Sequence, residues 1–176
     1  MNLPNKLSLL RMLLIPVMVL FMYLPGWGQP AALITFAAAA FTDFLDGHIA
    51  RSRNIVTNFG KFIDPVADKL LVLSAFVMLA AQGRMPAWAV VAILARELSV
   101  DGLRLIAVEQ GKVIAAGSLG KVKTVSQIVC VLWLMLGGFV NLPGAVSTVL
   151  ILWSVIITLW SGIDYFLRNH QYLKGA

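Results

Sequence analysis

Six apolar stretches, each about as long as a membrane-crossing helix, constrain this sequence more than any other feature. The hydrocarbon core of a bilayer is about 30 Å thick, and a helix needs around 20 mostly apolar residues to span it. The stretches that meet this length are approximately 7–24, 30–50, 65–81, 87–108, 122–140 and 144–166. The sequence therefore predicts an all-α integral membrane protein, a bundle of six transmembrane helices.

Short turn-forming segments separate these stretches and contain glycine and proline, which end helices. They are Pro25-Gly26, Gly60, Gly83 with Pro86, Gly111 to Gly120, and Pro143-Gly144. Because no linker or low-complexity run interrupts the pattern, we expect residues 1–176 to form a single membrane domain. No small-residue cleavage site follows Tyr23, so we expect the first stretch to be a retained helix rather than a signal peptide.

Composition excludes several other classes of protein. Only 12% of the residues are charged, whereas a soluble domain has roughly 25%. The net charge of +6 does not indicate nucleic-acid binding, because the basic residues lie at the ends of apolar stretches and form no solvated patch with aromatic residues. A single cysteine, Cys130, excludes an internal disulfide and a multi-cysteine metal site.

The basic residues predict the orientation of the helices. Those at the two tails and near the second and fourth connections are Lys6, Arg11, Arg51, Arg53, Lys61, Lys112, Lys121, Lys123, Arg168 and Lys174. The first, third and fifth connections together contain only Arg84. Lys and Arg concentrate on the cytoplasmic side of membrane proteins. We therefore expect a multi-pass protein of the plasma membrane with both termini in the cytoplasm.

Four carboxylates gather where the second stretch ends and the third begins. Asp43 and Asp46 are three residues apart, and Asp64 and Asp68 are four apart, so each pair lies on one side of its helix. The short connection makes the two helices antiparallel neighbours. We expect the four side chains to converge at the cytoplasmic face of the membrane.

Carboxylates beside a membrane interior need a compensating charge. Inserting one charged residue near the bilayer centre costs about 2.5–3.5 kcal/mol on insertion scales, and four acidic groups also repel one another. Oxygen ligands suit hard cations such as Mg²⁺, Mn²⁺ or Ca²⁺, and no His or Cys cluster indicates zinc. His48 stands alone near the aspartates, and we interpret it as a polar residue at the membrane interface.

A structural alternative exists for one of the four aspartates. Asp64 followed by Pro65 has the pattern of a helix N-cap with proline at the first helical position. Asp43 and Asp46 lie near a helix C-terminus, where the helix dipole disfavours negative charge, so capping does not explain them. The set of four is therefore better explained as a metal site.

The spacing of these residues carries a family resemblance. The string D-x-x-D-G-x-x-A-R-x8-G-x3-D-x3-D runs from Asp43 to Asp68 and resembles the signature of the CDP-alcohol phosphotransferases at every position. Flanking segments are similar to the bacterial phosphatidylglycerophosphate synthases within that family. These segments are Pro4 to Ser8 with Arg11, Arg96-Glu97 with Gly102 to Arg104, Gly120 to Thr124, and Ser161 to Tyr165.

The resemblance implies six transmembrane helices, a homodimer, a site that faces the cytoplasm, and CDP-diacylglycerol as donor. It assigns Asp43, Asp46, Asp64 and Asp68 to two divalent metal ions, Mg²⁺ or Mn²⁺ above all, with Asp68 also the general base. It assigns Gly47, Ala50, Arg51 and Gly60 to the cytidine diphosphate. Small residues permit close approach of a nucleotide, and arginine pairs well with phosphate. Taken alone, Arg51 could also be a cytoplasmic anchor.

The implied reaction is attack by an acceptor hydroxyl on the donor β-phosphate, which releases CMP. The acceptor residues that we expect are Arg96, Arg104, Lys121 and Lys123, which lie on the cytoplasmic side and have no evident anionic partner once the donor is bound. A second phosphate would supply one, and the resemblance identifies the acceptor as glycerol 3-phosphate. Two alternatives stay open: pairing of Arg104 with Glu97 and Asp101 within its own helix, and a simple anchoring role for the two lysines.

Two other functions are compatible with the motif or with the acidic cluster. The same chemistry could use serine, inositol phosphate or phosphatidylglycerol as acceptor. A divalent-cation carrier could also hold four acidic residues in a membrane bundle. A carrier needs polar residues through the whole bilayer, yet the outer halves of these helices are apolar, as at 31–34 and 76–79. The sequence therefore favours a one-sided site.

Overall fold

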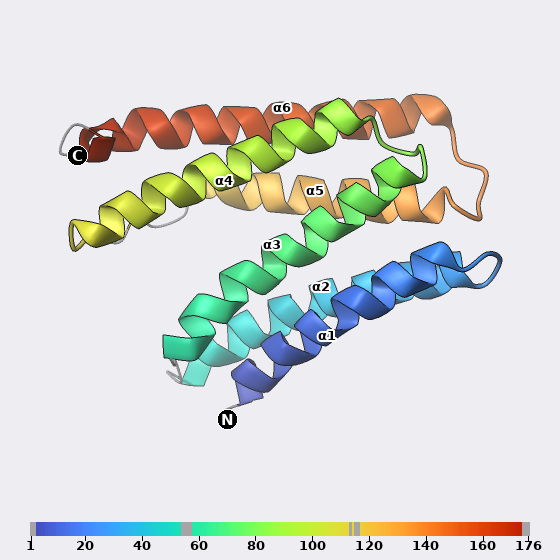
Figure 1. Ribbon diagram of the computed structural model, residues 1–176, viewed down its shortest axis with the longest axis horizontal. Coiled ribbons are helices and arrows are strands. Elements are labelled where there is room, and N and C mark those ends of the chain that lie inside the picture. The colour runs from blue at the N-terminus through green and yellow to red at the C-terminus, as the bar shows by residue number, and fades with distance from the viewer. Residues whose placement is uncertain (1–2, 54–57, 113, 115–116, 174–176) are drawn as a thin grey trace. The chain divides into compact units, whose positions relative to one another are not determined.

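The computed structural model describes residues 3–53, 58–112, 114 and 117–173, without the side chains of 3–6, 43–53, 58–62, 64, 65 and 173. The described residues form six α-helices and one short 3₁₀ helix, and no strand occurs among them. The helices are α1 (Leu3–Tyr23), α2 (Gly28–Arg53), α3 (Asn58–Ala81), α4 (Ala87–Glu109), α5 (Ser118–Leu136) and α6 (Gly144–Asn169), followed by η1 (His170–Leu173) (Figure 1). The predicted all-helical class and its six helices are confirmed.

A glycine lies in the turn that follows each of three helices, α1, α3 and α4. Gly26, Gly83 and Gly111 have φ angles of 64°, 70° and 73°, in the left-handed region that favours glycine. These positions lie in turns that the sequence predicts. The positions of these three turns are therefore determined by the local sequence, because each turn depends on a backbone conformation that few other residues adopt.

The third helix begins earlier than predicted. It begins at Asn58 rather than near 65, so Asp64 and Pro65 lie within α3 and the N-cap interpretation of Asp64 is wrong. Proline lacks the N–H that continues a helix, which is why local preference places a helix start there. Packing of α3 against α1 and α2 outweighs this local preference.

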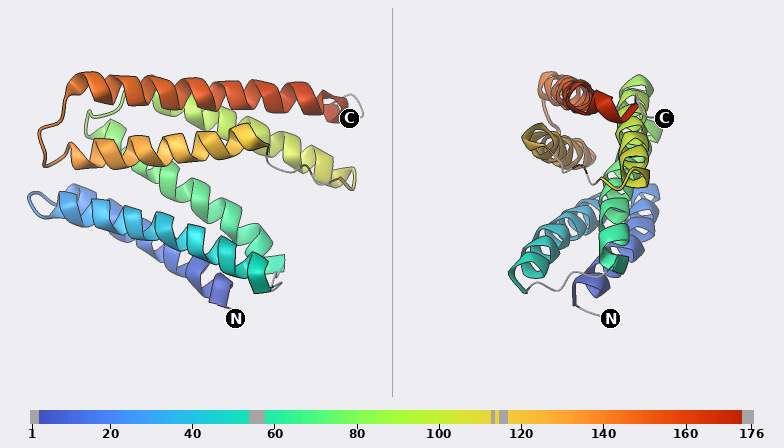
Figure 2. Two further views of the ribbon diagram at one scale, coloured as in Figure 1. Left: turned by 180° about the vertical axis from the view of Figure 1, so that it is seen from behind. Right: turned by 90° about the vertical axis from the view of Figure 1, so that its left-hand side faces the viewer.

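The chain forms two compact units, which we describe separately. The first contains residues 1–84 and 131–142. Within it, α1 packs against both α2 and α3 (Figures 1 and 2). Its buried residues include Met18, Met22, Ala32, Phe36, Ala39, Ala75, Phe76 and Leu79. The alanines on α2 and α3 allow close approach of helices, as is common between membrane helices.

Polar side chains form hydrogen bonds between helices of the first unit near the C-terminal end of α1. The carbonyl of Met22 accepts hydrogen bonds from Gln29 Nε2 at 3.1 Å and from Gln82 Nε2 at 2.8 Å. Arg84 donates to Gln29 Oε1 at 2.9 Å and lies against Gly138. Burial lowers the pKa of Arg84 from its ordinary value by desolvation. These contacts give several polar groups near the helix ends a protein partner.

The second unit contains residues 85–130 and 143–176. In it, α4 packs along α6, and η1 contacts both. Gln127 of α5 donates to Thr158 Oγ1 of α6 at 3.0 Å, and Trp153 of α6 donates to Ser126 Oγ of α5 at 3.1 Å. Hydrogen bonds of this kind connect apolar helices at defined positions.

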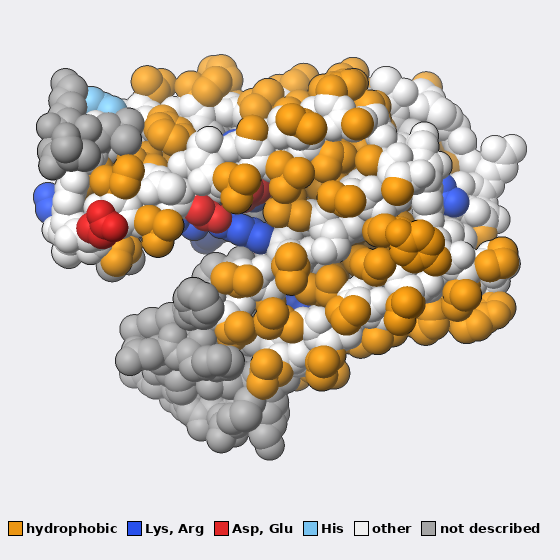
Figure 3. All heavy atoms as spheres, viewed as in Figure 1, with side chains coloured by type: hydrophobic (Ala, Val, Ile, Leu, Met, Phe, Trp, Pro, Cys, Tyr) orange, Lys and Arg blue, Asp and Glu red, His pale blue; other side chains and the backbone are white. Residues whose placement is uncertain are grey.

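Large apolar side chains cover much of the visible surface (Figure 3). Leu13, Ile34, Trp160 and Leu167 are each more than 60% exposed. A soluble monomer rarely exposes apolar area on this scale. Two helical stretches of the described chain are long and apolar enough to cross a membrane by length and composition: α5, and Gly144–Tyr172, which comprises α6 and most of η1.

Candidate functional site

The predicted donor-site residues lie on two consecutive helices. Asp43, Asp46, Gly47, Ala50 and Arg51 fall in the last part of α2, whereas Gly60, Asp64 and Asp68 fall in the first half of α3. The two helices contact each other. Except for Asp68, the side chains of these residues lie outside the described part of the structure. Their convergence therefore stays a prediction.

Asp68 forms an ion pair with an arginine from the first helix. Arg11 NH1 donates a hydrogen bond to Asp68 Oδ1. The Arg11 side chain is completely buried, whereas that of Asp68 is 39% exposed. The Asp68 side chain thus contacts a buried cation and is still partly accessible.

Sequence analysis missed Arg11 as a site residue and interpreted it as a topology signal. A usable signal was present, because Arg11 lies inside the first apolar stretch rather than at its end. A charge inside an apolar helix faces the protein interior and has a partner there. The structure identifies that partner as the last aspartate of the signature.

The chemistry of the donor set fits divalent metal ions. Carboxylate oxygens are the ligands of Mg²⁺ and Mn²⁺, and Asp68 presents a partly exposed carboxylate from α3. Among the side chains that the structure describes, no group of three or more His, Cys, Asp and Glu residues is found. Asp68 is the one member of the predicted metal-binding quartet whose side chain is described.

A second cluster of charges lies in the other unit and joins α4, α5 and α6. Glu97 Oε1 accepts from Lys123 Nζ at 2.5 Å and from Arg96 NH1 at 3.2 Å. Arg96 NH2 also donates to Ser161 Oγ at 2.6 Å. The side chains of Arg96, Glu97 and Lys123 are only 9%, 3% and 9% exposed. Two cations and one anion are thus buried together, where each needs a partner of opposite charge or a hydrogen bond.

The other two predicted acceptor residues are arranged differently. Arg104 Nε donates to the hydroxyl of Tyr165 at 3.1 Å, and its guanidinium lies 5.4 Å from the centre of the tyrosine ring. The Lys121 side chain is exposed near the beginning of α5. The structure therefore brings Arg96 and Lys123 together through Glu97. The expectation that these two cations have no anionic partner is wrong.

The two α6 residues that contact these arginines, Ser161 and Tyr165, belong to a polar stripe. Ser154, Thr158, Ser161 and Tyr165 are spaced by four, three and four residues, and all are buried. Such spacing places them on one face of the helix. This periodicity is readable from the sequence, but sequence analysis did not use it.

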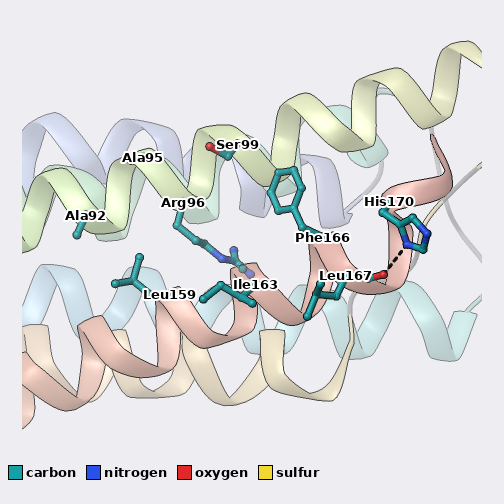
Figure 4. Close-up of a pocket in the computed structure, with 10 residues that line it drawn as sticks. Ala92, Ala95, Arg96, Ser99, Leu159, Ile163, Phe166, Leu167 and His170 are labelled. Carbon is teal, nitrogen blue, oxygen red and sulfur yellow. Dashed lines mark hydrogen bonds between the residues drawn. The ribbon is translucent and has the colours of Figure 1, made fainter. Parts of the chain in front are cut away.

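A pocket of about 560 Å³ adjoins this stripe between α4 and α6. Its lining includes Ala95, Arg96, Ser99, Gly162, Ile163 and Phe166. Figure 4 shows Arg96 extending from α4 toward Ile163 of α6. Apart from a few such polar groups, the pocket lining is apolar.

Comparison with known proteins identifies the family. Residues 1–160 match the model of the family described as CDP-alcohol phosphatidyltransferase. The chain is 44% identical to the CDP-diacylglycerol–glycerol-3-phosphate 3-phosphatidyltransferase of Bacillus subtilis, over 99% of this chain and 98% of that one. This chain therefore belongs to the CDP-alcohol phosphatidyltransferase family, which confirms the resemblance carried by the signature.

Two further relatives agree with this assignment. The Escherichia coli K12 enzyme of the same name is 39% identical, over 93% of this chain and 92% of that one. The probable phosphatidylglycerophosphate synthase of Mycobacterium tuberculosis H37Rv is also 39% identical, over 99% of this chain and 84% of that one. The similarity thus covers nearly the whole chain in each case.

Proposed function

We propose that this protein transfers the phosphatidyl group of CDP-diacylglycerol to sn-glycerol 3-phosphate, forming phosphatidylglycerol phosphate and CMP. The observation that carries the proposal is the identity of 39–44%, over nearly the full chain, to relatives named for this reaction. The complete signature from Asp43 to Asp68 supports it. The reaction belongs to phospholipid biosynthesis.

In the proposed donor site, Asp43, Asp46, Asp64 and Asp68 hold two divalent metal ions, with Mg²⁺ or Mn²⁺ the best fit to carboxylate ligands. When bound, such ions supply positive charge for the phosphoryl oxygens and for the leaving CMP. Gly47, Ala50, Arg51 and Gly60 line the cytidine diphosphate.

The proposed chemical step is a single displacement at phosphorus. An acceptor hydroxyl oxygen bonds to the β-phosphorus, and the bond from this phosphorus to the bridging oxygen breaks, so that CMP leaves with the electron pair. The hydroxyl proton passes to the carboxylate of Asp68. The contact with Arg11 would hold this carboxylate in place, and its partial exposure supports access by the acceptor.

In the proposed acceptor site, Arg96, Arg104, Lys121 and Lys123 bind the phosphate of glycerol 3-phosphate. Arg96 and Lys123 are buried beside Glu97, and the buried Nε of Arg96 has no hydrogen-bond partner in the described structure, which supports this proposal. A dianionic phosphate offers several strong acceptors for such donors. A neutral or zwitterionic acceptor such as inositol or serine lacks that group.

The proposed setting is the plasma membrane, with six membrane-spanning helices, both termini and the active site on the cytoplasmic side, and a homodimeric assembly. The exposed apolar surface and the asymmetric distribution of Lys and Arg support the topology.

The direct test of the proposed reaction uses purified protein with CDP-diacylglycerol and labelled glycerol 3-phosphate. Equal formation of CMP and labelled lipid supports the proposal. Metal flux into sealed vesicles without CMP release would instead favour a cation carrier.

A further inference from the structure

Gly162 lies where α6 passes the side chain of Arg96. A Cβ atom built at Gly162 would lie 2.8 Å from Arg96 Cγ and 3.4 Å from its Nε. Cγ is close to the α4 backbone, so Arg96 could not avoid that atom by moving only its tip. The absence of a side chain at Gly162 therefore permits the observed path of Arg96 across the helix interface.

The residues on either side of Gly162 hold the arginines by hydrogen bonds. Ser161 accepts from Arg96 NH2 at 2.6 Å, and Tyr165 accepts from Arg104 Nε at 3.1 Å. We call Ser161, Gly162 and Tyr165 the arginine cradle. All three residues are buried, so the contacts form inside the protein rather than at a solvated surface.

One hydrogen-bond donor of the Arg96 guanidinium, its Nε, has no acceptor in the described structure. Its NH1 and NH2 groups donate to Glu97 and Ser161, but its buried Nε has no hydrogen-bond partner in the described structure. A buried donor without an acceptor is unfavourable, so it persists where a ligand can satisfy it. Arg96 also lines the pocket between α4 and α6 (Figure 4).

We propose that the arginine cradle positions Arg96 and Arg104 for the anionic group of the acceptor, with Gly162 as the residue that sets the position of Arg96. This inference rests on the proposed function and deepens its acceptor site. The cradle residues act through the two arginines and do not themselves touch the reacting atoms. Fixing the guanidinium groups before binding removes the entropy loss that would otherwise weaken recognition.

The test compares Gly162→Ala with Gly144→Ala. Gly144 begins the same helix, and a Cβ there would meet no atom within 4 Å. We expect Gly162→Ala to raise the KM for glycerol 3-phosphate about tenfold or more, with less than about a twofold change in the KM for CDP-diacylglycerol. The Gly144→Ala control should leave both constants unchanged.

Serine variants separate positioning from simple packing. Ser161→Ala should raise the acceptor KM, whereas Ser161→Thr, which keeps the hydroxyl, should recover most of the loss. Acceptor binding without donor, measured by calorimetry on the purified protein, should weaken in parallel. The proposal is wrong if Gly162→Ala and Ser161→Ala keep the normal acceptor KM, or raise the donor KM by the same factor.

A failure of the proposed function would be visible separately. If the wild-type protein turns over another acceptor and not glycerol 3-phosphate, the proposed function is wrong. The same KM comparison, made with the acceptor that is used, then decides the role of the cradle. A selective rise in that KM supports positioning, and an unchanged KM excludes it.

Discussion

The buried guanidinium of Arg11 donates a hydrogen bond to the carboxylate of Asp68, which joins α1 to α3 across 57 positions of the sequence. The pair connects the first helix of the chain to the last aspartate of the signature. We therefore expect α1 to contribute to the proposed donor site, which the signature alone does not indicate.

Arg11→Met should lower kcat by about tenfold or more, because Asp68 loses the group that orients it. Arg11→Lys should retain more activity, since it keeps the charge but not the planar donor. A matched control is Arg168→Met, which breaks the Arg168–Asp164 pair on the exposed side of α6. Steady-state kinetics that show equal activity for Arg11→Met and the control would contradict this role.

Removing divalent cations should abolish activity, since the four aspartates are proposed to bind the donor only with metal between them. EDTA should stop CMP release, and added Mg²⁺ or Mn²⁺ should restore it. Asp43→Asn and Asp64→Asn should be almost inactive but should still insert into the membrane as dimers. Full activity in a thoroughly chelated sample would exclude the two-metal site.

Glu97→Gln should destabilise the protein, because Arg96 and Lys123 would remain buried without their shared anion. Removing one partner of a buried ion pair typically costs about 3–5 kcal/mol. The double variant Glu97→Gln with Lys123→Met should regain much of the lost stability. Thermal unfolding in detergent measures both effects, and an unchanged midpoint for Glu97→Gln would show that the pair contributes little.

Labelling of single cysteines tests the proposed orientation. In a Cys130→Ala background, Glu109→Cys should react with an impermeant reagent only from the cytoplasmic side, and Asn141→Cys only from the outside. Both positions are exposed and lie beside helix ends, so labelling reports topology rather than burial. The reverse pattern would overturn both the orientation and the cytoplasmic active site.

Local features of the sequence predicted much of this architecture. The turns at Gly26, Gly83 and Gly111 follow from backbone preference, so the six helices could be placed within a few residues. The start of α3 could not, because packing on α1 and α2 carries the helix through Pro65.

The contacts between distant helices were also beyond sequence reasoning. The sequence around Arg11 does not indicate that Asp68 is its partner, and the sequence around Arg96 does not indicate Ser161. The interpretation of Arg96 and Lys123 as cations without an anion was wrong because Glu97 contacts both, its neighbour Arg96 on α4 and the distant Lys123 on α5. Such partners depend on the tertiary arrangement, which a pattern of spacing along one helix does not contain.

The most direct measurement of the central claim is a comparison of acceptors with one donor. Purified protein is supplied with CDP-diacylglycerol and, in turn, with glycerol 3-phosphate, serine, inositol, inositol phosphate or phosphatidylglycerol, and CMP and lipid products are quantified. We expect glycerol 3-phosphate to give the highest kcat/KM, and Arg96→Ala and Arg104→Ala to raise its KM steeply with donor KM nearly unchanged. A higher kcat/KM with any other acceptor would contradict the proposed function.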